Sequence, residues 1–207
     1  MTAASRAAFG RRDAVVLVAV IAAAAALGIP TLQRVNRESR RTRCLANLST
    51  IGTAMGEYIA QSAGHWPAVA RLPSAEYHQP AWPSLPKVLS PFLSDVSAAF
   101  RCPADRRLLA EDHPLRKQFG ARTTYFESEG TSYEWVLQEL LAGQAVGRDP
   151  LARAEGLGMG PADQPIVWDF EPFHAHGDEK GAFNILYGDL KARPERGQLR
   201  LTVGQKK

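Results

Sequence analysis

An uncharged apolar run near the N-terminus constrains the fold of this chain more than any other feature. Residues 14–29 read AVVLVAVIAAAAALGI, sixteen residues without a charged side chain. A membrane-spanning helix needs about 20 apolar residues, with a range of roughly 17 to 25. Counting on through Leu32 gives nineteen residues, which is short but adequate. The sequence therefore predicts a chain that a helix ties to a membrane.

Arginines flank the apolar run on both sides. Three precede it and five follow it, namely Arg6, Arg11 and Arg12, then Arg34, Arg37, Arg40, Arg41 and Arg43. The positive-inside rule therefore does not settle the orientation of the span. A basic cluster directly after an apolar helix suggests acidic lipid headgroups or a partner helix before nucleic acid. The sequence has no zinc-finger spacing or aromatic RNA-binding signature, and we expect no nucleic-acid partner.

The segment after the run bears on whether the run is retained. A cleaved secretory signal would have its cleavage site near the small residues 24–26, whereas a retained run would continue into a long helix. Residues 31–60 contain no proline, and their apolar side chains recur at helical spacing, which favours retention. These side chains are Leu45, Leu48, Ile51, Met55, Tyr58 and Ile59. We expect one helix up to about residue 62, kinked at Pro30.

The combination of an apolar half-helix, a proline and an amphipathic half-helix resembles the N-terminal segment of type IV pilins and type II secretion pseudopilins. Prepilin peptidase cuts that family after a small residue, usually Gly, and before Phe or Met. The mature chains carry an acidic residue at position five and a proline at position twenty-two. A cut between Ala8 and Phe9 places Asp13 fifth and Pro30 twenty-second. Ala8 replaces the usual Gly, and Asp13 replaces the usual Glu.

The resemblance implies a domain organisation and a role for each of these residues. It implies a leader at 1–8, a transmembrane and amphipathic helix at 9–62 and an extracytoplasmic globular domain at 63–207. Phe9 would be the N-methylated mature N-terminus. The carboxylate of Asp13 would meet the N-terminal amine of a neighbouring subunit during assembly. A charged group at the centre of a bilayer costs about 2.5 to 3.5 kcal/mol, so such a carboxylate needs a partner.

Later motifs resemble one bacterial subgroup of prepilin-type proteins, which carries an H-x9-D-G signature. The segment CLANLSTIGTAMGEY from Cys44 resembles its C-x-x-N-L-x-x-I-G-x-A-x-x-x-Y element. CPAD from Cys102 resembles its C-P-x-D element, TSYEW from Thr131 its T-S-Y segment, and FNILYGDL from Phe183 its F-N-x-L-x-x-D-G segment. The resemblance thus extends from Phe9 to about residue 191.

The closing signature departs from the subgroup pattern at both ends. Asp189 is followed by Leu190 where the pattern has Gly. His176 lies thirteen residues before Asp189, and His174 lies fifteen before it, where the pattern has ten. No role is therefore carried over to either histidine.

Proline-rich and strand-like segments predict the structure of the globular domain. Residues 65–103 should be extended or turning, with one short helix near 87–93. A β-hairpin is predicted about the turn Ser128-Glu129-Gly130. Its strands are 123–126 and 131–136, and further strands are predicted at 165–169, 182–187 and 198–203. A long helix on a small antiparallel sheet is an α+β fold, the pilin-like arrangement.

Two kinds of metal site merit consideration. Asp169, Asp178 and Asp189 could hold a structural calcium ion, because oxygen-rich loops suit calcium. The segment HAHGDE at 174–179 resembles the H-x-H-x-D-H motif of binuclear metallohydrolases, with Glu179 in place of the third histidine. With only five histidines in the chain, a catalytic metal is the remote alternative, and a polar surface loop is the simpler one.

The two cysteines, Cys44 and Cys102, could form a disulfide or be two small buried side chains. They could approach each other if the proline-rich segment folds back along the helix. The sequence leaves both options open, and we expect no strong requirement for a bridge.

The sequence predicts a non-catalytic pilin-like or pseudopilin-like subunit of a type II secretion or type IV pilus-like system. Its expected partners are prepilin peptidase, the membrane and other pilin-like subunits. It would cross the inner membrane once, with its C-terminal domain extracytoplasmic. The alternatives are a monomeric, membrane-tethered or secreted binding domain and, remotely, a metal-dependent hydrolase. No nucleophile motif or glycine-rich phosphate loop points to an enzyme.

Overall fold

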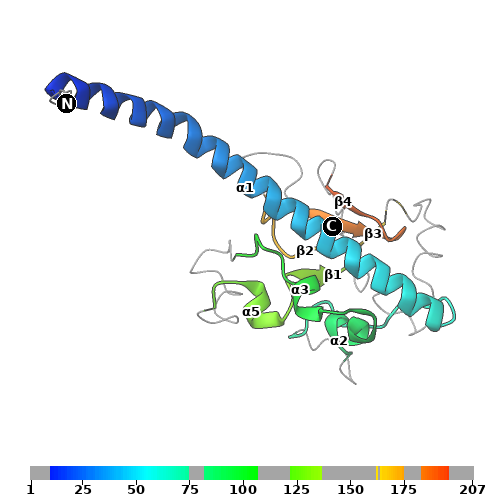
Figure 1. Cartoon of the computed structure of the whole chain (residues 1–207). Helices are drawn as coiled ribbons and strands as arrows, with labels where there is room; N and C mark the ends of the chain where they lie inside the picture. Colours follow the sequence, from blue (N-terminus) through cyan, green and yellow to red (C-terminus); the bar gives the residue numbers. More distant parts are fainter. Residues whose placement is uncertain are drawn as a thin grey trace, which may run out of the picture. The chain divides into compact units, whose positions relative to one another are not determined.

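The computed structural model describes residues 10–74, 82–106, 122–136, 162, 164–174 and 183–195. It confirms the expected α+β fold, in which a long N-terminal helix is followed by a small antiparallel sheet (Figure 1). The chain divides into two compact units, Met1–Ser39 and Arg40–Lys207. Helix α1, Arg11–Gln61, contributes residues to both units. We call its residues 11–39 the anchor segment and its residues 40–61 the domain segment.

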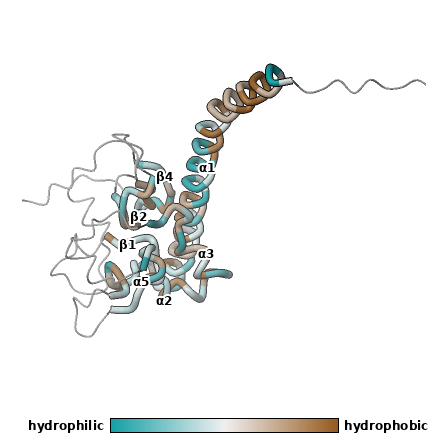
Figure 2. Tube along the Cα trace, turned by 90° about the vertical axis from the view of Figure 1, so that its left-hand side faces the viewer, coloured by the Kyte–Doolittle hydropathy of each residue, from teal (hydrophilic) through white to brown (hydrophobic). Residues whose placement is uncertain are grey.

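The anchor segment is helical without interruption, as its composition predicts. Alanine, leucine and arginine favour the helix, and the helix continues through Pro30. The hydroxyl of Thr31 donates to the carbonyl of Leu27, one turn earlier, at 2.9 Å. Figure 2 shows apolar residues concentrated in the N-terminal half of this segment and hydrophilic residues in the turns that follow. The large apolar side chains of this segment are exposed in the isolated chain.

The second unit is built around a four-stranded antiparallel sheet with strand order β1-β2-β3-β4. The strands are β1 (Tyr133–Trp135), β2 (Pro165–Asp169), β3 (Asn184–Tyr187) and β4 (Ala192–Pro194). Tyr133 is opposite Asp169, and Trp168 is opposite Ile185. All five residues of β2 are buried, which agrees with its nearly continuous apolar sequence, PIVWD. The strands predicted at 165–169 and 182–187 are confirmed, whereas the one predicted at 198–203 lies outside the described residues.

The domain segment of α1 supplies one side of the core. Leu48, Ile51 and Met55 are fully buried and belong to one apolar cluster with Ile166 and Leu186 of the sheet. The three- and four-residue spacing seen in the sequence therefore does mark the buried face of the helix. Burying one such side chain is worth about 1.5 to 3 kcal/mol. This face of α1 thus makes a large contribution to the stability of the domain.

Glycine allows a close approach between the helix and the β3–β4 turn. A Cβ atom on Gly52 would lie 2.7 Å from the carbonyl oxygen of Leu190 and 2.9 Å from the Cδ1 atom of Leu186. A Cβ atom on Gly56 would lie 3.3 Å from the Cδ1 atom of Leu190, a flexible side-chain end. Gly52 therefore has a packing reason to be glycine, which offsets its poor helix propensity.

In the part of the chain that the structure describes, short helices follow α1, and the first of them was predicted. Residues 87–93 were expected to be helical, and the structure has α2 (Leu85–Leu89) followed by the 3-10 helix η1 (Ser90–Phe92). Helix α3 (Val96–Phe100) was not predicted. Its N-cap is Asp95, whose carboxylate accepts a hydrogen bond from the backbone N–H of Ala98 at 2.9 Å.

The predicted β-hairpin at 123–136 is wrong in its first half. Residues Tyr125–Glu129 form helix α5, and only the second half contributes a strand, β1. Thr124 caps α5 in a reciprocal capping box with Glu127, and Gly130 ends it in the left-handed region, with φ of 71°. These two end signals outweigh the strand propensity of Tyr125 and Phe126, the aromatic residues between them.

The Gly52 contact makes a testable prediction. Gly52→Ala should destabilise the domain by about 1 to 2 kcal/mol, because the overpacking cost exceeds the gain in helix propensity. Gly56→Ala is the matched control on the same helix, and it should be neutral or stabilising by up to about 1 kcal/mol. Urea unfolding of the full chain in detergent, followed by tryptophan fluorescence, measures both. Equal stability of the two variants would contradict the close approach.

Candidate functional site

The first candidate site is the apolar surface of the anchor segment. Ten large apolar side chains are at least half exposed: Val15, Val16, Leu17, Val18, Val20, Ile21, Leu27, Ile29, Leu32 and Val35. A soluble monomer rarely exposes so much contiguous apolar surface. The helix is long and apolar enough to cross a membrane, as an anchor or as a signal sequence. This surface is therefore suited to a lipid environment or to contact with other apolar helices.

The residues expected to direct processing and assembly lie at the start of this segment. Ala8 and Phe9 are outside the described residues. Asp13 lies in the first turns of α1, and its side chain is not among those described. Pro30 lies inside α1, which continues past it. The roles expected for these residues remain predictions.

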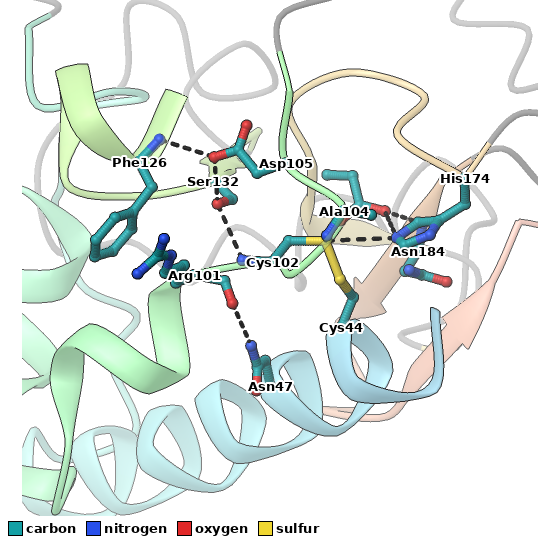
Figure 3. The surroundings of a disulfide bond; sticks show 11 residues. Cys44, Asn47, Arg101, Cys102, Ala104, Asp105, Phe126, Ser132, His174 and Asn184 are labelled. Atoms are coloured by element: carbon teal, nitrogen blue, oxygen red, sulfur yellow. Dashed lines mark hydrogen bonds and ion pairs between the residues drawn. A yellow bond between two sulfur atoms is a disulfide. The ribbon is translucent and has the colours of Figure 1, made fainter. Parts of the chain in front are cut away.

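The second candidate site is a disulfide between α1 and the segment after α3. Cys44 and Cys102 are bonded, with their Cα atoms 5.0 Å apart and 58 residues between them in the sequence. Both are buried, with exposed fractions of 0% and 1%. Next to the bond, Asn47 donates from Nδ2 to the carbonyl of Arg101 at 2.7 Å (Figure 3). The end of the proline-rich segment, at Arg101 and Cys102, thus does lie against the helix.

Asp105 fixes the turn that follows Cys102. Its backbone N–H donates to the carbonyl of Cys102 at 3.0 Å. Its carboxylate accepts hydrogen bonds from the backbone N–H of Phe126 and from the hydroxyl of Ser132 (Figure 3). It also accepts one from the backbone N–H of Tyr125. The Ser132 hydroxyl oxygen in turn accepts from the backbone N–H of Cys102 at 3.0 Å. Cys102 and Asp105 of the CPAD motif therefore link the turn after α3 to helix α5 and to Ser132, which directly precedes β1.

His174 lies against the disulfide. Its Nε2 atom is 3.6 Å from Sγ of Cys102 and 3.5 Å from Oδ2 of Asp169. Asp169 ends β2 and His174 follows it in the next turn, so the chain direction brings both to the same end of the sheet. Asn184, the first residue of β3, donates its backbone N–H to Oδ2 of Asp169 at 2.7 Å. The ligand atoms of Cys44, Cys102, Asp169 and His174 all lie within 4.8 Å of one another.

Burial dominates the electrostatics of this cluster. It raises the pKa of Asp169 well above its usual value, although the N–H of Asn184 and the charge of Arg41 act in the opposite direction. Burial also lowers the pKa of His174 from 6.5 to about 4, with further lowering by Arg41 and Arg106. The imidazole is therefore neutral at pH 7. Within the described residues, Oδ1 of Asp169 accepts no hydrogen bond.

Two of the three aspartates expected to bind calcium, Asp169 and Asp189, do not lie together. Asp169 is at the end of β2 beside Asn184, whereas Asp189 lies beyond Tyr187, opposite the start of β2. At about 3.4 Å per residue, the two carboxylates lie at opposite ends of the strand pair. Asp189 forms an ion pair with Arg193 instead. Asp178, like His176 and Glu179 of the HAHGDE segment, lies outside the described residues.

The β3–β4 turn explains how leucine occupies the position where the subgroup pattern has glycine. Leu190 has a φ of 60°, in the left-handed region that favours glycine. A non-glycine residue there costs about 1 to 2 kcal/mol. The side chain of Leu190 is partly buried against the core cluster. Its apolar contact with α1 offsets part of the backbone strain.

Comparison with known proteins gives no further assignment. No protein-family model, no curated protein and no solved structure matches the chain.

The buried bridge revises the expectation that it would not be strongly required. Closing a loop of this length is worth about 4 kcal/mol in the chain-entropy description. The double variant Cys44→Ala and Cys102→Ala should therefore lose about that much stability, measured as a lower urea midpoint. Reductant should lower the midpoint of the wild type to a similar value and leave the variant unchanged. Equal stability of the variant and the wild type would show that the bridge is dispensable.

Proposed function

We propose that this chain is a non-catalytic pilin-like or pseudopilin-like subunit of a type II secretion or type IV pilus-like system. Prepilin peptidase would process it, and it would assemble with like subunits through its N-terminal helix. The observation that carries the proposal is the exposed apolar surface of the anchor segment in a helix that continues into the domain core. The domain would be extracytoplasmic, with the anchor segment crossing the inner membrane once.

The continuity of α1 supports retention of the apolar run. The domain segment of the helix is a core element, and the helix has no break between residue 11 and residue 61. A detachable signal sequence has no need to share a helix with the core of the mature domain. The disulfide at Cys44 also agrees with an oxidising, extracytoplasmic location for this domain.

The composition of the anchor segment supports association with neighbouring helices. In lipid, helices associate by close packing and polar contacts, because lipid tails are as apolar as leucine. Residues 22–26 are all alanine, and Gly28 follows them. A Cβ atom on Gly28 would contact nothing within 4 Å in the isolated chain. A second helix could therefore approach this face closely.

Processing gives the first test of the proposal. The mature chain should begin at Phe9 and carry an N-methyl group, because a cut after Ala8 places Asp13 and Pro30 at the positions that the resemblance requires. Mass spectrometry of the N-terminal peptide from native membranes checks this. A mature start near Leu27 would indicate an ordinary secretory signal and overturn the proposal.

Assembly gives the second test. Asp13→Ala should leave membrane insertion and domain folding intact but reduce crosslinking between subunits at least tenfold. The substitution removes a polar contact between subunits that lipid cannot replace. Asp13→Glu is the matched control and should crosslink like the wild type. The measurement is crosslinking of the full-length protein in its native membrane. Unchanged crosslinking of Asp13→Ala would contradict the role of Asp13, and no crosslinking in the wild type would favour a monomeric, membrane-tethered domain.

A further inference from the structure

We propose that Cys44, Cys102, His174 and Asp169 bind one zinc ion when the two cysteines are thiols. The zinc-bound dithiol and the disulfide would be two alternative states of the same buried position. This proposal rests on the geometry of the globular unit alone, and it is independent of the function proposed for the anchor segment.

The distances in the cluster fit tetrahedral coordination. Zinc binds sulfur at about 2.3 Å and nitrogen or carboxylate oxygen at about 2.0 to 2.2 Å, so ligand atoms around it lie roughly 3.3 to 3.8 Å apart. Nε2 of His174 is 3.6 Å from Sγ of Cys102 and 3.5 Å from Oδ2 of Asp169. Two edges of a zinc tetrahedron therefore already have the required length. Reduction breaks the bond between the two sulfur atoms, which can then move apart to the separation that two sulfur ligands have in a zinc tetrahedron.

The donor set selects zinc over calcium. Thiolate, imidazole and carboxylate are all ligands that zinc takes in proteins, whereas calcium takes oxygen ligands almost exclusively. Three of the four side chains come from different parts of the fold: α1, the turn after α3 and the end of β2. Such a site would link these three parts of the fold at the position where the disulfide now links α1 to the turn after α3.

The surroundings of Asp169 supply a second, independent observation. Asp169 is fully buried, and its Oδ1 atom has no hydrogen-bond partner within the part of the chain that the structure describes. A buried carboxylate oxygen without a partner is costly, and a cation would satisfy it. The N–H of Asn184 holds the other oxygen at 2.7 Å and so orients the carboxylate, as outer hydrogen bonds do in metal sites.

The charges also balance. Two thiolates and one carboxylate carry a charge of about −3, and zinc reduces this to about −1. The guanidinium of Arg41 is near enough to affect both Asp169 and His174 electrostatically. Its positive charge offsets the remaining negative charge, so the buried centre would be close to neutral overall.

The chemistry that links the two states is a two-electron reduction. A phosphine and one water molecule convert the disulfide into two thiols, and the phosphine becomes a phosphine oxide. Zinc then displaces one proton from each thiol as the thiolates bind. The chain is synthesised with both cysteines as thiols, so the dithiol state precedes the disulfide during the life of each molecule.

Cobalt provides the spectroscopic test, because cobalt bound by thiolates absorbs in a characteristic way and competes with zinc. The full-length protein in detergent, reduced with a phosphine and kept free of oxygen, should bind one cobalt ion per chain, and zinc should displace it. Asp169→Asn and His174→Gln should each weaken binding at least tenfold, whereas the exposed His65→Gln control should bind like the wild type. Oxidised protein should bind no cobalt at this position.

Two results would overturn the proposal. One is the absence of stoichiometric cobalt binding by the reduced wild type. The other is equal binding by the wild type, Asp169→Asn and His174→Gln, since cysteines in an unfolded chain would bind cobalt without the other two ligands. Circular dichroism of each variant in its oxidised form shows whether the variant folds. A variant that fails this control is replaced by Asp169→Ser or His174→Ala at the same position.

Discussion

Burial of one face of the domain segment of α1 is the interaction on which the rest of the globular unit depends. Among the described residues the sheet has four short strands. Its large core cluster includes residues of α1, and the cluster without α1 residues is much smaller. Leu48, Ile51 and Met55 cover this sheet, and Gly52 lets the β3–β4 turn approach the helix backbone. Cys44 lies on the same buried face of the helix, and its disulfide bonds that face covalently to Cys102. The domain segment of α1 is thus a core element of the globular unit.

The sequence predicts those parts of the fold that depend on local periodicity. The helix follows from apolar side chains three and four residues apart, and β2 and β3 follow from short apolar runs between turn residues. Helix α5 was missed because Tyr125 and Phe126, together with the threonines that precede them, resemble a strand, whereas the capping residues at its two ends decide its structure. Strand β4 was missed because ARP, its sequence, has no strand signature and depends on pairing with β3. Such pairing is a property of the tertiary structure.

The candidate sites divide in a similar way. The apolar anchor surface is a property of consecutive residues, so it can be read from the sequence. The cluster at the disulfide joins residues more than 100 positions apart, and the sequence shows Cys44, Asp169 and His174 only as separate candidates. Asp169 and Asp189 looked like one site because both are acidic and lie near the same strands. Strand direction places them at opposite ends, and this cannot be inferred without the register.

The disulfide also has a mechanical consequence. In a filament, tension on a subunit would enter through the anchor segment and leave through the globular unit. With Cys44 bonded to Cys102, this tension passes across the bridge and bypasses the 58-residue separation between them. That stretch would extend to about 200 Å if it were pulled out, at roughly 3.4 Å per residue. The bond keeps the chain between Cys44 and Cys102 from extending under load, so a loaded subunit can lengthen only in the segments before Cys44 and after Cys102.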